Sequence, residues 1–161
     1  MGNIYVATFA AVAVTAAQDV FEITAPSNSR VAIREIRIGQ YSDAGDSQAE
    51  MLSVTVIRGH STSGSGGTSP TPVPIMGHAG VAASTTSVEA NNTTIASSGT
   101  PVTLCADSFN VMAGWRYYPV PDERPIITNS GILVVRITAP ADSLTLSGTI
   151  VFEEVGYGLA A

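Results

Sequence analysis

The chain of 161 residues contains no lysine, and charged residues make up only 12% of it. That fraction is well below the ~25% of an average soluble domain. The seven cations are all arginine, and the formal net charge is −6. A nucleic-acid partner requires a clustered basic surface, as does an anionic membrane, so the composition argues against both. Low charge also leaves little electrostatic barrier to self-association, which favours an oligomer.

Cysteine and histidine are also scarce, which restricts the available chemistry. Cys105 is the single cysteine, so no disulfide can form within the chain, and its place after the strand-like PVTL is typical of a small buried hydrophobe. The two histidines, His60 and His78, lie in no recognisable catalytic frame and are expected to be polar loop residues. A zinc site needs three or four ligands on rigid supports. The sequence therefore predicts a protein that is not an enzyme and that binds no cofactor or metal.

The acidic residues do not change this prediction. Asp43, Asp46 and Glu50 form an acidic loop, but their spacing does not match an EF-hand, so we expect a solvated turn without calcium. Asp122-Glu123 and Glu153-Glu154 are sequence neighbours. Adjacent side chains on an extended chain point to opposite faces, so neither pair forms a catalytic dyad.

Long hydrophobic runs are absent too. No apolar run reaches the length of a transmembrane helix. The N-terminus, MGNIYVATFAAVAVTAAQ, lacks the positive region of a secretion signal, so we expect the protein to stay inside the cell in which it is made. Its residues alternate instead, with Tyr5, Ala7, Phe9, Ala11 and Ala13 on one face, which indicates a strand.

What remains is strand character almost throughout. The only helix candidate is a weak turn around Asp46–Met51, and turn signals separate the extended segments. This pattern predicts one all-β domain over residues 1–161, an antiparallel β-sandwich of jelly-roll type. The expected strands are Ile4–Val14, Val20–Thr24, Val31–Ile38, Leu52–Arg58, Pro101–Cys105, Phe109–Tyr118, Pro125–Thr128, Ile132–Thr138 and Leu144–Val155.

Two strands carry more detail. In the last one, four apolar residues fall on one face and polar residues on the other, as in an antiparallel sheet with one dry face; the four are Leu144, Leu146, Ile150 and Phe152. In the third strand the alternation loses its phase between Ile33 and Ile36. One extra residue would restore it, so we predict a β-bulge around Arg34-Glu35.

Residues 59–106 contain a single formal charge, Glu89, and interrupt the strands with a long excursion over residues 59–100. Residues 61–69 are rich in Gly, Ser and Thr and are expected to be flexible. Pro70, Pro72 and Pro74 should hold the following segment extended, since each proline restricts its own φ and its neighbour. Ile75 and Met76 then lie at the end of a stiff arm. A loop of this length is usually functional, and we interpret it as an arm that docks on a neighbouring subunit.

Trp115 and Tyr117 offer an alternative. On an extended segment they share one face, and aromatic side chains on a β-sandwich can stack on sugar rings, whereas the ordinary role of such residues is packing in a core or interface. A carbohydrate- or receptor-binding module therefore stays open as a second hypothesis.

Five short motifs are spread over most of the chain: Val56–His60 (VIRGH), Thr62–Gly67 (TSGSGG), Pro70–Pro72 (PTP), Val88–Thr94 (VEANNTT) and Ser147–Glu154 (SGTIVFEE). In these motifs the chain resembles a family of small virion proteins of tailed bacteriophages. The resemblance implies a capsid decoration or cement protein, a β-rich trimer that clamps adjacent capsid subunits. It implies no catalytic residues.

Together these observations predict a non-enzymatic homotrimer that is made in the host cytoplasm and stabilises a phage head on the capsid surface. Its partners would be itself and the major capsid protein, and the alternative is the sugar-binding module of a phage tail. The candidate contact residues are Pro70, Pro72, Pro74, Ile75, Met76, Asn91 and Asn92.

Overall fold

Eleven strands account for about half of the chain, and β1, β3 and β4 carry the largely alternating burial pattern of a half-buried strand. The computed structural model describes residues 2–40, 50–77 and 80–156. Its strands are β1 (Asn3–Val14), β2 (Gln18–Thr24), β3 (Ser29–Gln40), β4 (Met51–His60), β5 (Val73–Pro74), β6 (Ser87–Glu89), β7 (Val102–Asn110), β8 (Trp115–Tyr117), β9 (Ile126–Thr128), β10 (Ile132–Ile137) and β11 (Leu144–Gly156), and its one short 3-10 helix is η1 (Pro121–Glu123).

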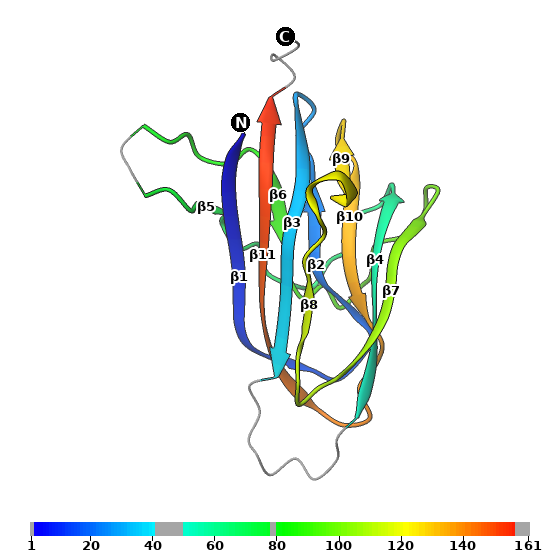
Figure 1. The fold of residues 1–161 in the computed structure, drawn as a ribbon. Coiled ribbons are helices and arrows are strands. Elements are labelled where there is room, and N and C mark those ends of the chain that lie inside the picture. The colour runs from blue at the N-terminus through cyan, green and yellow to red at the C-terminus, as the bar shows by residue number, and fades with distance from the viewer. Residues whose placement is uncertain (1, 41–49, 78–79, 157–161) are drawn as a thin grey trace.

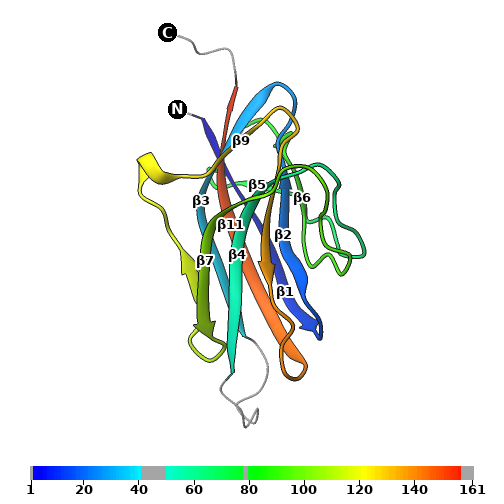
Figure 2. The same cartoon turned by 90° about the vertical axis from the view of Figure 1, so that its right-hand side faces the viewer.

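The strands form two antiparallel sheets that pack face to face (Figures 1 and 2). Sheet A has the order β5-β1-β11-β3-β8, and β9 also pairs with β3. Sheet B has the order β6-β2-β10-β4-β7. The predicted all-β antiparallel sandwich is confirmed. Of the predicted helical turn Asp46–Met51, the first four residues lie outside the described residues, and Met51 begins β4.

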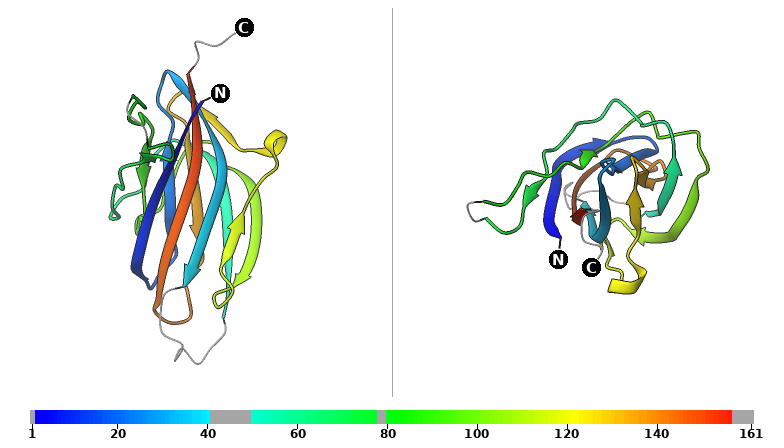
Figure 3. Two further views of the ribbon diagram at one scale, coloured as in Figure 1. Left: turned by 60° about the vertical axis from the view of Figure 1, so that its left-hand side comes forward. Right: turned by 90° about the horizontal axis from the view of Figure 1, so that it is seen from above.

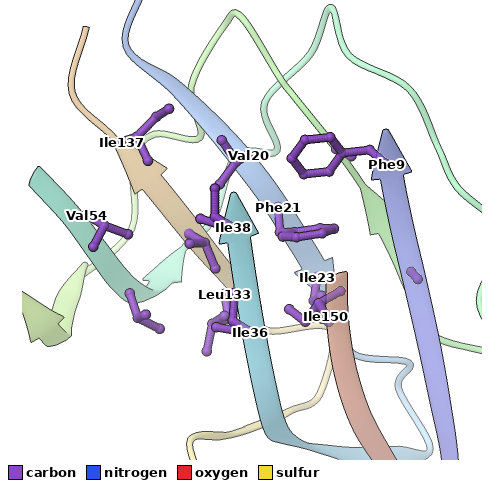
Figure 4. Packing of buried hydrophobic residues seen from close by; sticks show 14 of the residues in the cluster. Phe9, Val20, Phe21, Ile23, Ile36, Ile38, Val54, Leu133, Ile137 and Ile150 are labelled. Carbon is purple, nitrogen blue, oxygen red and sulfur yellow. The ribbon is translucent and has the colours of Figure 1, made fainter. Parts of the chain in front are cut away.

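The core fills the space between the sheets (Figure 4). Phe9 of β1 meets Phe21 of β2 with ring centroids 5.1 Å apart, so this pair joins sheet A to sheet B. Tyr5 stacks on Phe152 within sheet A at 5.8 Å. The predicted dry face of the last strand is confirmed: the four apolar residues of β11 are at most 1% exposed. Each such side chain contributes about 1.5–3 kcal/mol when it is fully buried.

Register shifts occur in several strand pairs, and two of them bear on the predicted inward and outward faces. Along β11, Val151 pairs with Glu35 and Phe152 with Ile33, so Arg34 is the extra residue and the predicted bulge is confirmed. A second bulge lies in β1, where the register shifts between Phe9 and Val12 and Ala11 has a φ of 53°. The sequence prediction missed it, and the predicted grouping of Ala11 and Ala13 on one face with Tyr5, Ala7 and Phe9 is wrong, because after the bulge Val14 is buried and the two alanines are exposed.

Candidate functional site: an anchored arm

The excursion returns along itself as an irregular two-stranded ladder (Figure 3). Thr62 pairs with Ser97, Ser65 with Thr94 and Thr68 with Ala90, and the backbone N–O distances are 2.8–3.0 Å. The expectation that residues 61–69 are flexible is therefore wrong. The glycines serve close packing, since a Cβ at Gly67 would collide with the carbonyl oxygen of Ala90.

A buried carboxylate of sheet B holds this ladder in place. Glu22 of β2 is 1% exposed, and its two carboxylate oxygens accept hydrogen bonds from the Ser63 hydroxyl at 2.5 Å and the Gly64 N–H at 2.9 Å. The side-chain amide of Asn92 donates to Glu22 at 3.3 Å and to Glu89 at 2.7 Å. The one charged residue of the excursion thus joins the same network.

A second buried carboxylate, Asp19, fixes the returning segment. Its oxygens accept two hydrogen bonds from the Arg136 guanidinium, at 2.6 and 3.1 Å, and a third from the Ala96 N–H at 2.7 Å. Arg136 also donates to the Ala96 carbonyl at 2.9 Å. Asp19 is fully buried, and hydrogen-bonded charge pairs of this kind hold geometry tightly. The excursion is therefore ordered by its own domain rather than by a partner.

Asn91 and Asn92 belong to this anchor. They are 6% and 1% exposed, and the Gln18 side chain donates to the amide oxygen of Asn91 at 3.0 Å. Their side chains therefore bind the excursion to β2 and offer little surface to a partner. Sequence reasoning missed Asp19, Glu22 and Arg136 as anchors. The signal was two carboxylates inside one apolar strand, which indicates a strand covered on both faces.

The middle of the excursion leaves this ladder as an arm, defined here as residues 70–77 and 80–85 (Figure 1). Its rising segment pairs with the edge of sheet A, where Val73 lies beside Val6 and Pro74 beside Tyr5. The Ile75 N–H donates to the carbonyl of Ile4 at 3.0 Å. The predicted extended proline segment is confirmed at Val73–Pro74, and β5 adds a short strand to sheet A.

The descending end of the arm is anchored as well. The Tyr5 hydroxyl donates to the Ala82 carbonyl at 2.9 Å. Ser84 and Thr85 donate to the carboxylate of Glu154, at 3.0 Å for the Ser84 hydroxyl. Both ends of the arm are thus hydrogen-bonded to the same corner of sheet A.

The exposed side of the arm is apolar. Pro70, Pro72 and Pro74 are half-buried, whereas the side chains that alternate with them point to solvent. Val73 is 53%, Ile75 54% and Met76 63% exposed. The predicted contact residues Ile75 and Met76 are therefore accessible, whereas the prolines are turned partly toward the rest of the protein.

The structure describes only some of the side chains that could support catalysis or bind a metal ion. His60 is the last residue of β4 and is buried, so its predicted place in a loop is wrong; neither ring nitrogen has a hydrogen-bond partner among the described residues. His78, Asp43 and Asp46 lie outside the described residues. Within residues 2–40, 50–77 and 80–156 no three His, Cys, Asp or Glu side chains group as metal ligands.

No helix in this part of the chain is long and apolar enough to cross a membrane.

The aromatic residues Trp115 and Tyr117 lie on β8, at the end of sheet A away from β5 and the arm. Trp115 is only 7% exposed, and its indole N–H donates to Asp107 at 3.1 Å, which together with the Ser108 N–H holds the pKa of that carboxyl below its usual range. Trp115 and Tyr117 stack on each other at 5.9 Å. Burial is the main cause of the raised pKa of Tyr117, and burial followed by the charge of Asp107 raises that of Cys105. Trp115 thus packs in the core and does not form the exposed shelf that sugar binding requires.

The arm is therefore the part of the described chain that best fits a functional site: ordered, anchored at both ends and apolar on its outer side. Comparison with protein-family models, with curated proteins and with solved structures finds no match to this chain.

Proposed function

We propose that this protein is a non-enzymatic structural subunit, a capsid decoration or cement protein that self-associates and bridges the subunits of a phage head. In this proposal it is made in the host cytoplasm and resides on the capsid surface. Its partners are further copies of itself, as a trimer, and the major capsid protein. The proposal needs no cofactor.

The observation that carries the proposal is the anchored arm. Val73, Ile75 and Met76 are each more than half exposed and belong to neither hydrophobic cluster of the described residues. Exposed apolar side chains on an ordered support are typical of a protein–protein contact. Because the arm is already held by hydrogen bonds at both ends, docking costs less conformational entropy than it would for a free loop.

The strand pairing supports the same class of protein. When β5, β6 and β9 are set aside, eight strands remain, and the first pairs with the last, the second with the seventh, the third with the sixth and the fourth with the fifth. This is the pairing of one long antiparallel ribbon rolled up on itself, and it favours a jelly roll, an architecture found in viral capsid proteins. The five motifs that resemble phage virion proteins agree with it.

The sugar-binding alternative depends on Trp115 and Tyr117. A ring that stacks on a sugar must expose its face, and Trp115 is buried against Tyr117 and the core. The geometry therefore favours the structural proposal.

The double variant Ile75→Ser/Met76→Ser tests the proposal. A deletion of residues 61–76 would also remove the ladder that Glu22 holds, so the test should alter only the tip. We expect the variant to keep the thermal midpoint of the unaltered protein and to lose at least tenfold in cosedimentation with purified phage heads that lack the protein. Met112→Ser is the matched control, because Met112 is 61% exposed on a different loop. Equal cosedimentation of both variants and the unaltered protein, or none for the unaltered protein, would refute the proposal.

A further inference from the structure

We infer that the arm of one copy docks on the opposite edge of sheet A in a second copy, so that the protein associates head to tail. The inference rests on the proposed function only in taking the arm as the docking element. It adds the surface that receives the arm, which nothing in the proposal specifies.

The receiving surface is a second set of exposed apolar side chains. Tyr118 (63% exposed) and Val120 (55%) lie between β8 and β9, and Ile126 (47%) is the first residue of β9. We call these three residues the edge patch. The guanidinium of Arg116 lies 5.1 Å from the ring of Tyr118, which holds the ring on the outside of the sandwich.

The arm and the edge patch lie at the two ends of one sheet. In sheet A, β5 is the first strand, and β8 and β9 pair with β3 at the far end. Figure 3 shows the arm and the segment around η1 leaving the sandwich in different directions, well apart from each other. Two copies placed side by side can therefore join the arm of one to the edge patch of the other, with sheet A running on from copy to copy.

The distribution of charge favours a second copy of this chain as the partner. Residues 70–85 contain no Asp, Glu, Lys or Arg, and residues 116–126 contain two arginines and two carboxylates, so both surfaces are neutral overall. The net charge of −6 therefore comes entirely from the rest of the chain. Joining these two surfaces buries no net charge, and keeps apart the parts of the two copies that repel each other.

A contact between two arms would be neutral too, but it would leave the edge patch of both copies uncovered. The head-to-tail contact covers the arm and the edge patch of every copy. Such a contact is heterologous and closes into a ring when the rotation between copies allows it, which is the symmetry that a trimer needs.

Two variants with complementary defects test the inference on the full-length protein alone. Ile75→Ser/Met76→Ser removes the apolar tip of the arm, and Val120→Ser/Ile126→Ser removes most of the edge patch. All four positions are about half exposed or more, so circular dichroism should show unchanged folding. Sedimentation velocity then measures the mass of each variant alone and of an equimolar mixture, with Met112→Ser as the control.

We expect the unaltered protein and the control to form an oligomer, each double variant alone to be a monomer, and the mixture to stop at a 1:1 dimer. That dimer would join the intact arm of one variant to the intact patch of the other. The inference is overturned if the patch variant keeps the unaltered mass, if the mixture stays monomeric, or if the unaltered protein is a monomer.

A second measurement keeps the test decisive if a serine variant fails to fold. Ile75→Cys and Val120→Cys should form a disulfide-linked dimer when mixed under oxidising conditions, at least tenfold more than Ile75→Cys alone. Equal cross-linking in the two samples would instead indicate a contact between arms. These readouts use no phage heads, so the inference can fail while the proposed function stands, and the reverse.

Discussion

Two buried carboxylates, Asp19 and Glu22, determine where the excursion lies. In a chain with so few charges, these side chains are 0% and 1% exposed and accept hydrogen bonds from residues far away in the sequence. A buried charge is tolerated when it is paired and fully hydrogen-bonded, and it becomes costly when one partner is removed.

Asp19→Ala should therefore destabilise the protein far more than the small number of atoms it removes would suggest. The variant leaves the Ala96 N–H without an acceptor and the largely buried guanidinium of Arg136 without its carboxylate partner, and we expect a loss on the order of 3 kcal/mol in the free energy of unfolding. Urea denaturation followed by fluorescence measures it. Asp142→Ala, at an exposed turn, should change the value by less than about 0.5 kcal/mol. A similar small effect of both variants would show that the ion pair does not hold the excursion.

Among the elements, β3 shows how a strand keeps its phase across a bulge. Val31 and Ile33 point inward on one side of Arg34, and Ile36 and Ile38 point inward on the other. Removing the extra residue, Arg34, leaves all four apolar residues in regular alternation.

We therefore expect a chain without Arg34 to fold, with a loss of about 1 kcal/mol from the partly exposed ion pair with Glu153. A chain without Ala32 should lose more than about 3 kcal/mol, because Val31 then faces outward and Arg30 inward. Thermal unfolding of the two deletions compares them directly. The reverse order of stability would contradict the assignment of Arg34 as the bulged residue.

The ladder of the excursion is a second element, and it is ordered although its sequence predicts a flexible segment. Gly67→Ala should separate its two segments, since the new Cβ collides with the backbone of Ala90, and hydrogen exchange at the Thr68 and Ala90 amides should rise at least tenfold. At Gly77 a Cβ meets nothing within 4 Å, so Gly77→Ala should leave those amides protected. Equal exchange in both variants would restore the expectation of a flexible segment.

For the whole molecule, the pairing of the first strand with the last dominates the topology. Asn3 lies opposite Glu154, and β11 is a central strand of sheet A. Closing so long a stretch of chain before its contacts form slows folding, and sandwiches of this kind fold in milliseconds to seconds.

A circular permutant should therefore fold faster. Joining the termini with a short Gly/Ser linker and opening the chain between Asp142 and Ser143 turns β11 and β1 into a local hairpin. We expect the refolding rate to rise at least threefold in stopped-flow fluorescence, relative to the natural order carrying the same linker at its C-terminus. An unchanged rate would mean that this pairing forms after the rate-limiting step.

Much of the fold could be predicted from the sequence. Most of the predicted strands and the bulge near Arg34 follow from alternation, which is a local property of a few neighbouring side chains. The predicted strand Phe109–Tyr118 was wrong, because Phe109 and Asn110 end β7 and a turn at residues 111–113 separates them from β8. The bulge in β1 was missed because alanines are small enough for either face. The short strands β5 and β6 were missed because their pairing depends on partners more than 60 residues away.

The candidate site divides in the same way. The exposed tip at Ile75 and Met76 followed from prolines and charge, which act locally, whereas the roles of Asn91 and Asn92 did not. The sequence by itself determined the all-β class, the inward faces of most strands and the stiff proline segment. Only the tertiary structure decided that the Gly/Ser-rich residues are ordered, because their order comes from the carboxylates of Asp19 and Glu22 on a distant strand.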